Sequence, residues 1–541
     1  MHFKSKNRVA GFLLCGIGAV AAACGDDSAA TTAGSGGSGG SGAQTTQGAT
    51  SAASTSSAGG EGGLGQGGLG QGGAGGTGGL GGAGGAPPCD ALTEEGCEVG
   101  EACEVVDDGT AACFAPITVV GRVFDYFSDD AIEGARVVAR DTNGAAVSGV
   151  ASSAADGSYE LAVPATRDAD GNVVSEAINL RVDASGYEAF PTPPRSALPI
   201  ALDTAVPGEP GEPDVIQNAA TDVGLIALLS TDGLGTVSGS IDLTALADPP
   251  SPRGMLILAG NATGIADGDG TYVVFNVPEG TVDVNGYLAG VNVEPTTADV
   301  VTGEETPDVI LTALATETVT VSGSVQIVNG NGFSVTSVIL ALEDTFDEST
   351  IRFDSPPGLR AGDVSGAWAI DGVPDGRYVV LAGFENDGLV RDPDTSIGGT
   401  ELLHIEVAGA DVAIADGFKI TGALAVISPG VDGPELTEAT PTFIFEDDSS
   451  EDQYDILVRD SFGTLVWETS VPGISGNQDV EVVYEGPALL PGNLYQFKAT
   501  SVKDGIPIST TEDLRGVFQI EGELGAGGAG GAGGAGGAGG I

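Results

Sequence analysis

The stretch Val237-Ser238-Gly239-Ser240-Ile241 decides the fold, because the chain uses it three times. Its other copies are Val119-Val120-Gly121-Arg122-Val123 and Val321-Ser322-Gly323-Ser324-Val325. Each copy alternates apolar and other residues around a central glycine, which is the period-two pattern of a strand with one buried face. Three such strands, spaced along one chain, predict three similar β domains.

Two further elements follow this opening strand. A glycine–x–aromatic step recurs at Gly157-Ser158-Tyr159, Gly270-Thr271-Tyr272 and Gly366-Ala367-Trp368. Val277-Pro278-Glu279-Gly280 and Val373-Pro374-Asp375-Gly376 then supply Pro/Gly turn chemistry in the second and third units. Because the aromatic residue recurs at an equivalent strand position, we expect it in the core of each unit.

Together these elements resemble the carboxypeptidase regulatory-like domain, whose fold is a transthyretin-like or prealbumin-like β-sandwich. The first unit fits that family best, through Ile132-Glu133-Gly134-Ala135-Arg136-Val137. It departs from the family at Ala165–Ala177, where we expect an extended hairpin. The second and third units are assigned on strand rhythm and turns.

A different strand pattern begins at Pro441. Pro441–Phe445, Tyr454–Asp460 and Gly463–Trp467 alternate as strands with turn residues between them, and Leu490–Ala499 completes the set. This part is similar to a fibronectin type III or related immunoglobulin-like module, in which Trp467 and Tyr495 would be core aromatics. The alternative for Trp467 is an exposed platform for a ligand.

Four cysteines, Cys89, Cys97, Cys103 and Cys113, form an even set in one short segment. In an exported chain, such a set predicts a disulfide-bonded module, and three pairings are possible. A four-thiolate zinc site is the alternative, which the absence of a C-x-x-C pair disfavours.

The N-terminal segment predicts export. Basic residues precede an apolar run, Val9–Ala23, which is followed by Cys24. This resembles a bacterial lipoprotein signal, in which the cysteine becomes the lipid-bearing first residue, although Ala21 stands where that family usually has leucine. Because Gly25 rather than aspartate follows, the resemblance implies an outer-membrane location. A plain secretory signal is the alternative.

Two segments are predicted to be disordered. Residues 25–88 are mainly Gly, Ser, Ala, Thr and Gln, and the chain after Glu523 repeats Gly and Ala. The organisation that we predict is residues 1–23 as lipoprotein signal, 24–88 as disordered linker, 89–115 as four-cysteine module, 116–230 as regulatory-like β-sandwich, 231–315 and 316–420 as two further β-sandwich repeats, 421–522 as fibronectin type III-like or immunoglobulin-like sandwich, and 523–541 as disordered tail.

Charge and composition exclude several functions. The 541 residues include 76 acidic and 19 basic residues, with a net charge of −57. A field of that sign repels nucleic acid. The chain has two His, and outside the predicted signal only His404 remains, on an alternating strand pattern typical of a solvated position. We therefore predict a protein that is not an enzyme and has no cofactor.

Two acidic stretches are candidate calcium sites, one with Asp168 and Asp170 and one with Asp267 and Asp269. Neither matches the twelve-residue calcium loop, and Asp-Gly is itself a turn signal. We therefore expect turns at both places.

The function predicted from these features is that of a lipid-anchored cell-surface protein, with four β-sandwiches in line acting in structure, adhesion or interaction. Its expected partners are an outer-membrane lipid, through Cys24, and an unknown surface protein or glycan. The alternative is a carbohydrate-binding surface protein with a starch-binding-like fold, which an aromatic content of 5% disfavours.

Overall fold

The computed structural model describes the chain between Cys89 and Gly522. Within that range it leaves out 90–95, 99, 107–108, 142, 175–176, 193–194, 196, 209–211, 329–335, 348–352, 384–389, 392–401, 416, 422–423, 432, 449–450, 475–477 and 512–514. The predicted signal, linker and tail, with Cys24, lie outside the described residues. The chain divides into units 1–81 and 82–541, and every described residue belongs to the second unit.

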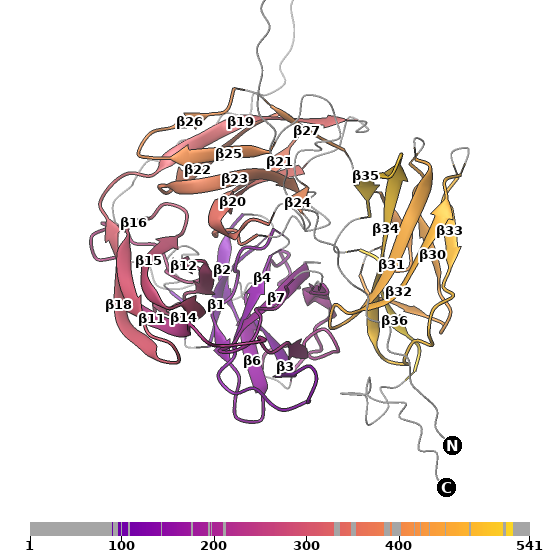
Figure 1. Ribbon diagram of the computed structural model, residues 1–541, viewed down its shortest axis with the longest axis horizontal. Coiled ribbons are helices and arrows are strands. Elements are labelled where there is room, and N and C mark those ends of the chain that lie inside the picture. Colours follow the sequence, from indigo (N-terminus) through magenta and orange to yellow (C-terminus); the bar gives the residue numbers. More distant parts are fainter. Residues whose placement is uncertain are drawn as a thin grey trace, which may run out of the picture. The chain divides into compact units, whose positions relative to one another are not determined.

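The described elements are β-strands, apart from two 3-10 turns, η1 (Leu202–Thr204) and η2 (Glu343–Thr345). They form tandem β-sandwiches after a two-stranded module (Figure 1). The predicted all-β fold is therefore confirmed. The exact domain limits stay predictions.

The four-cysteine module and the first sandwich use the first ten strands. The module is the hairpin of β1 (Ala102–Val105) and β2 (Ala111–Phe114). One sheet of the sandwich has the order β10 (Val223–Leu225), β3 (Ile117–Asp125), β6 (Ser158–Val163), and β9 (Val215–Ile216) also pairs with β3. The other sheet has the order β5 (Ala151–Ser152), β4 (Arg136–Arg140), β7 (Ala177–Asp183), β8 (Ile200–Ala201).

The second and third sandwiches repeat this plan. One sheet of the second sandwich has the order β14 (Thr271–Pro278), β11 (Leu234–Asp242), β18 (Glu305–Leu314), β16 (Asn292–Glu294). Its other sheet has the order β13 (Ala262–Ile265), β12 (Leu256–Ala259), β15 (Gly280–Tyr287), β17 (Thr296–Val300). One sheet of the third sandwich has the order β22 (Ala367–Val373), β19 (Val319–Val328), β26 (Val412–Ala413), and β27 (Phe418–Thr421) also pairs with β19. Its other sheet has the order β21 (Arg360–Val364), β20 (Thr336–Leu342), β23 (Gly376–Gly383), β24 (Val390–Arg391), and β25 (Leu403–Val407) also pairs with β23.

The fourth sandwich has a different strand order. Its smaller sheet is β28 (Val426–Ser428), β30 (Thr442–Phe445), β33 (Val480–Val483). Its larger sheet is β29 (Glu435–Thr437), β36 (Val517–Ile520), β34 (Leu494–Lys503), β31 (Gln453–Asp460), β32 (Leu465–Pro472), with β35 (Ile506–Thr510) on β34.

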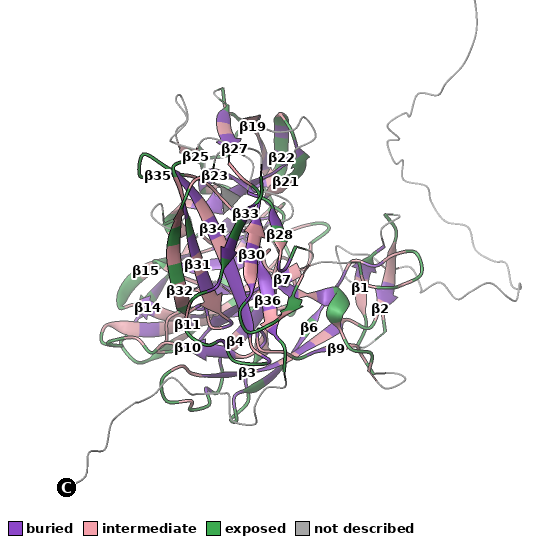
Figure 2. Ribbon diagram, turned by 90° about the vertical axis from the view of Figure 1, so that its right-hand side faces the viewer, coloured by how far each residue is buried: buried purple, intermediate pink, exposed green. Residues whose placement is uncertain are grey.

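The alternating sequence pattern produces alternating burial. In β6 every second residue is buried, and the buried residues of the strands are visible in Figure 2. One continuous apolar cluster fills the first sandwich, from Ile117 on β3 to Leu225 on β10. Burial of apolar surface at about 25 cal/mol per Å² is the main stabilising contribution to such cores.

The repeated glycine and the repeated aromatic residue meet across neighbouring strands. In the first three sandwiches the opening strand (β3, β11 or β19) pairs antiparallel with the aromatic strand (β6, β14 or β22), and it pairs parallel with a closing strand. The three register pairs are Gly121 with Tyr159, Gly239 with Tyr272, and Gly323 with Trp368. The aromatic side chains are buried, so the prediction of a core position is confirmed.

The glycine leaves room for the aromatic side chain. The Tyr272 hydroxyl donates a hydrogen bond to the Val309 carbonyl on the closing strand at 2.8 Å. A Cβ at Gly239 would overlap that same carbonyl oxygen and would lie 2.9 Å from the hydroxyl. Tyr159 donates in the same way to the Thr221 carbonyl, at 2.5 Å. In the second sandwich the motif thus ties three strands of one sheet together, and in the first it ties two strands to the segment that leads into β10.

We expect Gly239→Ala to lower the free energy of unfolding by about 3 kcal/mol, because the added methyl group overpacks this contact. Urea unfolding followed by circular dichroism measures the change. The matched control is Gly366→Ala, where a Cβ would meet no atom within 4 Å, and where we expect a change within about 0.5 kcal/mol. Equal midpoints for the two variants would contradict this account of the motif.

Candidate functional site

Two disulfides close the four-cysteine module. Cys89 bonds to Cys103 and Cys97 bonds to Cys113, with Cα atoms 5.8 and 5.4 Å apart. Cys103 on β1 and Cys113 on β2 are register partners in the hairpin, and each belongs to a different disulfide. Both strands are therefore cross-linked to the segment that precedes the hairpin. The predicted disulfide module is confirmed, and the structure selects one of the three pairings. All four sulfurs are in disulfides, so none of them is a free thiolate as the zinc alternative requires.

Arg167 joins this module to the first sandwich. Its guanidinium forms an ion pair with Glu104 on β1 and lies over the Phe114 ring of β2, 4.8 Å from the ring centroid. The Arg167 N–H also donates to the Val105 carbonyl at 3.0 Å. Arg167 and Glu104 are both buried, so the contact is a packed junction.

The hairpin that presents Arg167 contains one of the calcium candidates. Arg167 bridges to Val173, which confirms the predicted hairpin after β6. Asp168 accepts hydrogen bonds from the N–H groups of Asp170 and Asn172 at 2.9 and 2.8 Å, and the Asn172 side chain lowers the pKa of the Asp168 carboxyl. The carboxylate therefore closes a turn.

The second calcium candidate is also a turn. Asp269 accepts hydrogen bonds from the N–H and hydroxyl groups of Thr271, at 2.8 and 2.7 Å. Asp267 accepts from the Gly268 N–H at 2.7 Å and from the Val150 N–H of the first sandwich at 3.2 Å. Both turn predictions hold, and the Asp267 turn also contacts the neighbouring sandwich.

A buried ionic cluster joins the first three sandwiches. Arg181 on β7 pairs with Asp183 on the same strand and with Asp354 of the third sandwich, at 2.8 Å in each case. Its Nη2 donates to the hydroxyl of Thr263 on β13, also at 2.8 Å, and that hydroxyl donates to Asp354 at 2.6 Å. The Arg181 side chain is 5% exposed. One guanidinium thus contacts three sandwiches.

The arginines of this cluster keep the Asp354 carboxyl ionised. Burial opposes ionisation of Asp354, but Arg181 and Arg140 outweigh burial and lower the pKa of its carboxyl. A carboxyl whose pKa falls on folding adds stability above its unfolded pKa, and this stability is lost as the pH falls through the folded pKa. The cluster is therefore charged at neutral pH and weakened by acid.

Arg195 joins the fourth sandwich to the first. Its guanidinium donates to the Phe462 carbonyl of the fourth sandwich at 2.8 Å and to the Gly224 carbonyl of β10 at 2.6 Å. It also lies over the rings of Tyr126 and Phe190. The first sandwich therefore contacts each of the other three, which differs from the expectation of four sandwiches in line.

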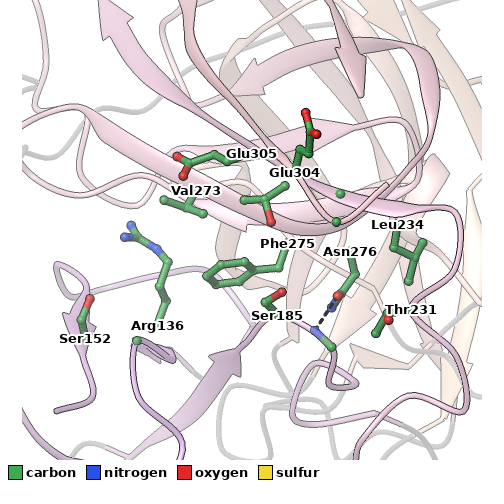
Figure 3. Close-up of a pocket in the computed structure, with 15 residues that line it drawn as sticks. Arg136, Ser152, Ser185, Thr231, Leu234, Val273, Phe275, Asn276, Glu304 and Glu305 are labelled. Atoms are coloured by element: carbon green, nitrogen blue, oxygen red, sulfur yellow. Dashed lines mark hydrogen bonds between the residues drawn. The ribbon is translucent and has the colours of Figure 1, made fainter. Parts of the chain in front are cut away.

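A cavity of about 570 Å³ lies where the first and second sandwiches meet. Arg136 of β4, Phe275 of β14 and Glu305 of β18 contribute side chains to its lining, and Figure 3 shows them around one space. Asn276 forms part of the wall: its amide accepts from the Gly186 N–H at 2.9 Å and donates to the Ala184 and Tyr187 carbonyls, at 3.2 and 2.9 Å. These three hydrogen bonds connect the two sandwiches.

These cavity residues were not predictable from the local sequence. Arg136 occupies a variable position of the family motif, and Phe275 and Asn276 lie in a stretch whose pattern predicts only a strand. The available signal was Asn276 itself, since asparagine adopts a positive φ more readily than most residues, and its φ is 57°.

The single histidine considered for catalysis is exposed. His404 lies on β25, and its Nδ1 is 3.1 Å from Glu343 Oε1. The prediction of a solvated strand position is confirmed. Tyr495 is buried as expected, whereas Trp467 is only half-buried, at the edge of the fourth core, where its ring contacts those of Phe443 and Tyr484.

Among the residues that the structure describes, none belongs to a helix long and apolar enough to span a membrane.

Comparisons with solved structures return distant matches, and each of the three given below has a TM-score under 0.5. No protein-family model and no curated protein sequence matches the chain. The Bacillus anthracis TIE protein is 11% identical, with 80% of this chain and 73% of that chain covered and a TM-score of 0.13. A streptococcal ancillary pilin is 11% identical (56% and 98% covered, TM-score 0.15), and a minor pilin of Streptococcus agalactiae is 14% identical (36% and 100% covered, TM-score 0.17). The regulatory-like and fibronectin type III resemblances therefore stay predictions.

We expect non-reducing peptide mapping to yield linked pairs Cys89–Cys103 and Cys97–Cys113, as the structure pairs them. Mass spectrometry of the same digest after reduction is the control, since it should release four separate peptides. Linked peptides in another combination, or stoichiometric zinc with four free thiols, would contradict the pairing.

We expect Asp354→Asn to lower the stability by about 3 kcal/mol at pH 7, because the variant leaves the buried Arg181 without one of its two carboxylates. The difference in melting temperature should begin to shrink below about pH 3.9, the unfolded pKa of an aspartate, and should vanish only as the pH falls through the lower pKa that Asp354 has in the folded protein.

The control for this experiment is Asp308→Asn. Asp308 is exposed and has a φ of 59°, a conformation that asparagine adopts equally well. We expect its melting curve to follow that of the wild type at every pH. A difference between wild type and Asp354→Asn that stays constant down to acid pH would show that the ionised carboxylate is not the stabilising group.

Proposed function

We propose that this chain is a lipid-anchored protein of the bacterial cell surface that acts through its folded β-domains in structure, adhesion or interaction. Cys24 carries the lipid in this proposal, and the absence of aspartate at position 25 places the anchor in an outer membrane. The three repeats belong to the regulatory-like class and the last sandwich to the fibronectin type III-like class. The protein has no enzymatic activity and no nucleic-acid partner.

The observation that supports the proposal most is the way in which the folded part starts. The disulfide module follows the predicted linker directly, and Arg167 packs it onto the first sandwich through Glu104 and Phe114. Disulfides persist in oxidising compartments outside the cytoplasm. A disulfide-bonded module at this position would connect the sandwiches rigidly to the end of an anchored tether.

The size of the tether fits the same function. The 64 residues from Gly25 to Pro88 are rich in glycine, and a coil of this kind spans about 40–50 Å on average. That reach would hold the sandwiches clear of a lipid surface. The net charge of −57 would add repulsion from anionic lipid headgroups.

We expect Cys24→Ala to move the protein from the membrane fraction to the soluble fraction, because the variant has no thiol to carry the lipid. Fractionation of cells that express the full chain, followed by immunoblotting, measures the distribution. Cys15→Ala is the matched control, since Cys15 lies inside the apolar run of the predicted signal, and it should stay with the membrane. Membrane retention of Cys24→Ala would refute the anchor.

A further inference from the structure

The cavity between the first two sandwiches has the properties of a site for a small polar molecule. Its volume of about 570 Å³ lies within the range of about 300–1,000 Å³ that is usual for ligand sites, which occur preferentially where domains meet. It combines an aromatic ring, a guanidinium group and a carboxylate within one lining.

Arg136 supplies hydrogen-bond donors to this cavity. The half-buried guanidinium donates one hydrogen bond, to the Ile265 carbonyl at 3.3 Å, although a guanidinium has five N–H groups. It forms no ion pair among the described residues. Asp267 and Asp183 influence its charge from a greater distance. Most of its donors therefore lack a protein acceptor in the described part of the chain.

Phe275 and Glu305 supply the other two kinds of contact. The half-buried Phe275 ring and the Arg136 guanidinium face the same space from opposite sandwiches (Figure 3). Glu305 reaches this space from β18, and its Oε1 accepts a hydrogen bond from the Ser238 hydroxyl. That bond orients the carboxylate and leaves Oε2 for a further donor.

The walls of the cavity are held in place before any ligand binds. The three hydrogen bonds of the Asn276 amide tie β14 to the segment after β7. The backbone on the other side is close-packed, because a Cβ at Gly235 would lie 2.6 Å from the Val301 carbonyl oxygen. Fixed walls reduce the conformational entropy that binding would cost.

We propose that this cavity binds one pyranose unit of a neutral saccharide, with the sugar ring against Phe275 and sugar hydroxyls hydrogen bonded to Arg136 and Glu305. A pyranose has an apolar C–H face, which packs on an aromatic ring. Its hydroxyls both donate and accept, so they satisfy a guanidinium and a carboxylate together.

The charges favour a neutral sugar over an acidic one. Burial lowers the pKa of the Arg136 guanidinium, and the negative charges of Asp267, Asp183 and Asp269 act against that shift. Two more carboxylates, those of Glu304 and Glu305, line the cavity. An anionic ligand would also enter against the field of a chain whose net charge is −57. This inference goes beyond the proposed surface function, which requires no saccharide site.

The test is isothermal titration of the full chain, in detergent, with hexasaccharides of glucose, mannose, galactose and N-acetylglucosamine, and with trigalacturonic acid as the acidic probe. We expect at least one neutral hexasaccharide to bind and trigalacturonic acid not to bind. Phe275→Ala and Arg136→Gln should each weaken that binding at least about ten-fold.

Glu305→Gln provides a variant that is safe for folding, because Glu305 is exposed. It should weaken binding with an unchanged melting temperature. Phe127→Ala is the matched control, since its ring is 77% exposed on the first sandwich and outside the cavity, and it should bind as the wild type does. The proposal is overturned by no binding of any neutral hexasaccharide at about 10 mM, by binding of trigalacturonic acid alone, or by binding that Phe275→Ala and Glu305→Gln leave unchanged.

Discussion

The contact between the motif glycine and the aromatic side chain opposite it is the constraint on which the repeated sandwiches depend. The glycine lets the aromatic ring cross the opening strand, and in two sandwiches the tyrosine hydroxyl then donates to a backbone carbonyl, that of Val309 on β18 or that of Thr221 just before β10. One side chain thus connects strands that are far apart in the sequence. In the third sandwich Trp368 replaces tyrosine, and its Nε1 is buried with no partner in the described part of the chain. A buried donor of this kind costs about 1–3 kcal/mol, so the third sandwich retains the packing of the motif without its hydrogen bond.

The sequence predicted those features that depend on local pattern. The opening strands, the buried aromatics, the hairpin after β6 and the turns at Asp168 and Asp267 follow from period-two alternation and from turn residues, and the structure contains them. The disulfide module was also predictable, because cysteine count and spacing are local properties. The pairing of the cysteines was not predictable, because the same cysteine count and spacing allow all three combinations.

The contacts between sandwiches could not be predicted from local pattern. Arg181 is one of many strand residues, and nothing near it in the sequence indicates Thr263 or Asp354 as partners. The cavity was missed for the same reason, since Arg136 and Glu305 come from different sandwiches. Trp467 shows a smaller error: its alternating strand pattern indicated a core position, but it lies at the edge of the core on an outer strand, where burial is incomplete.

Several contacts between the sandwiches share one physical feature: each uses one of the few basic residues of an acidic chain. A chain with 76 acidic and 19 basic residues repels itself when it packs. Four arginines of the first sandwich contact its neighbours. Arg167 contacts the four-cysteine module, Arg136 and Arg181 contact the second sandwich, Arg181 also contacts the third, and Arg195 contacts the fourth. Arginine suits this role better than lysine, because its planar group can donate to several acceptors while it packs against a ring. Arg167, Arg181 and Arg195 use their donors on protein groups, and Arg167 and Arg195 also pack against aromatic rings. Arg136 makes a single hydrogen bond beside a cavity, and this difference from the other three is the reason to assign it a ligand rather than a purely structural role.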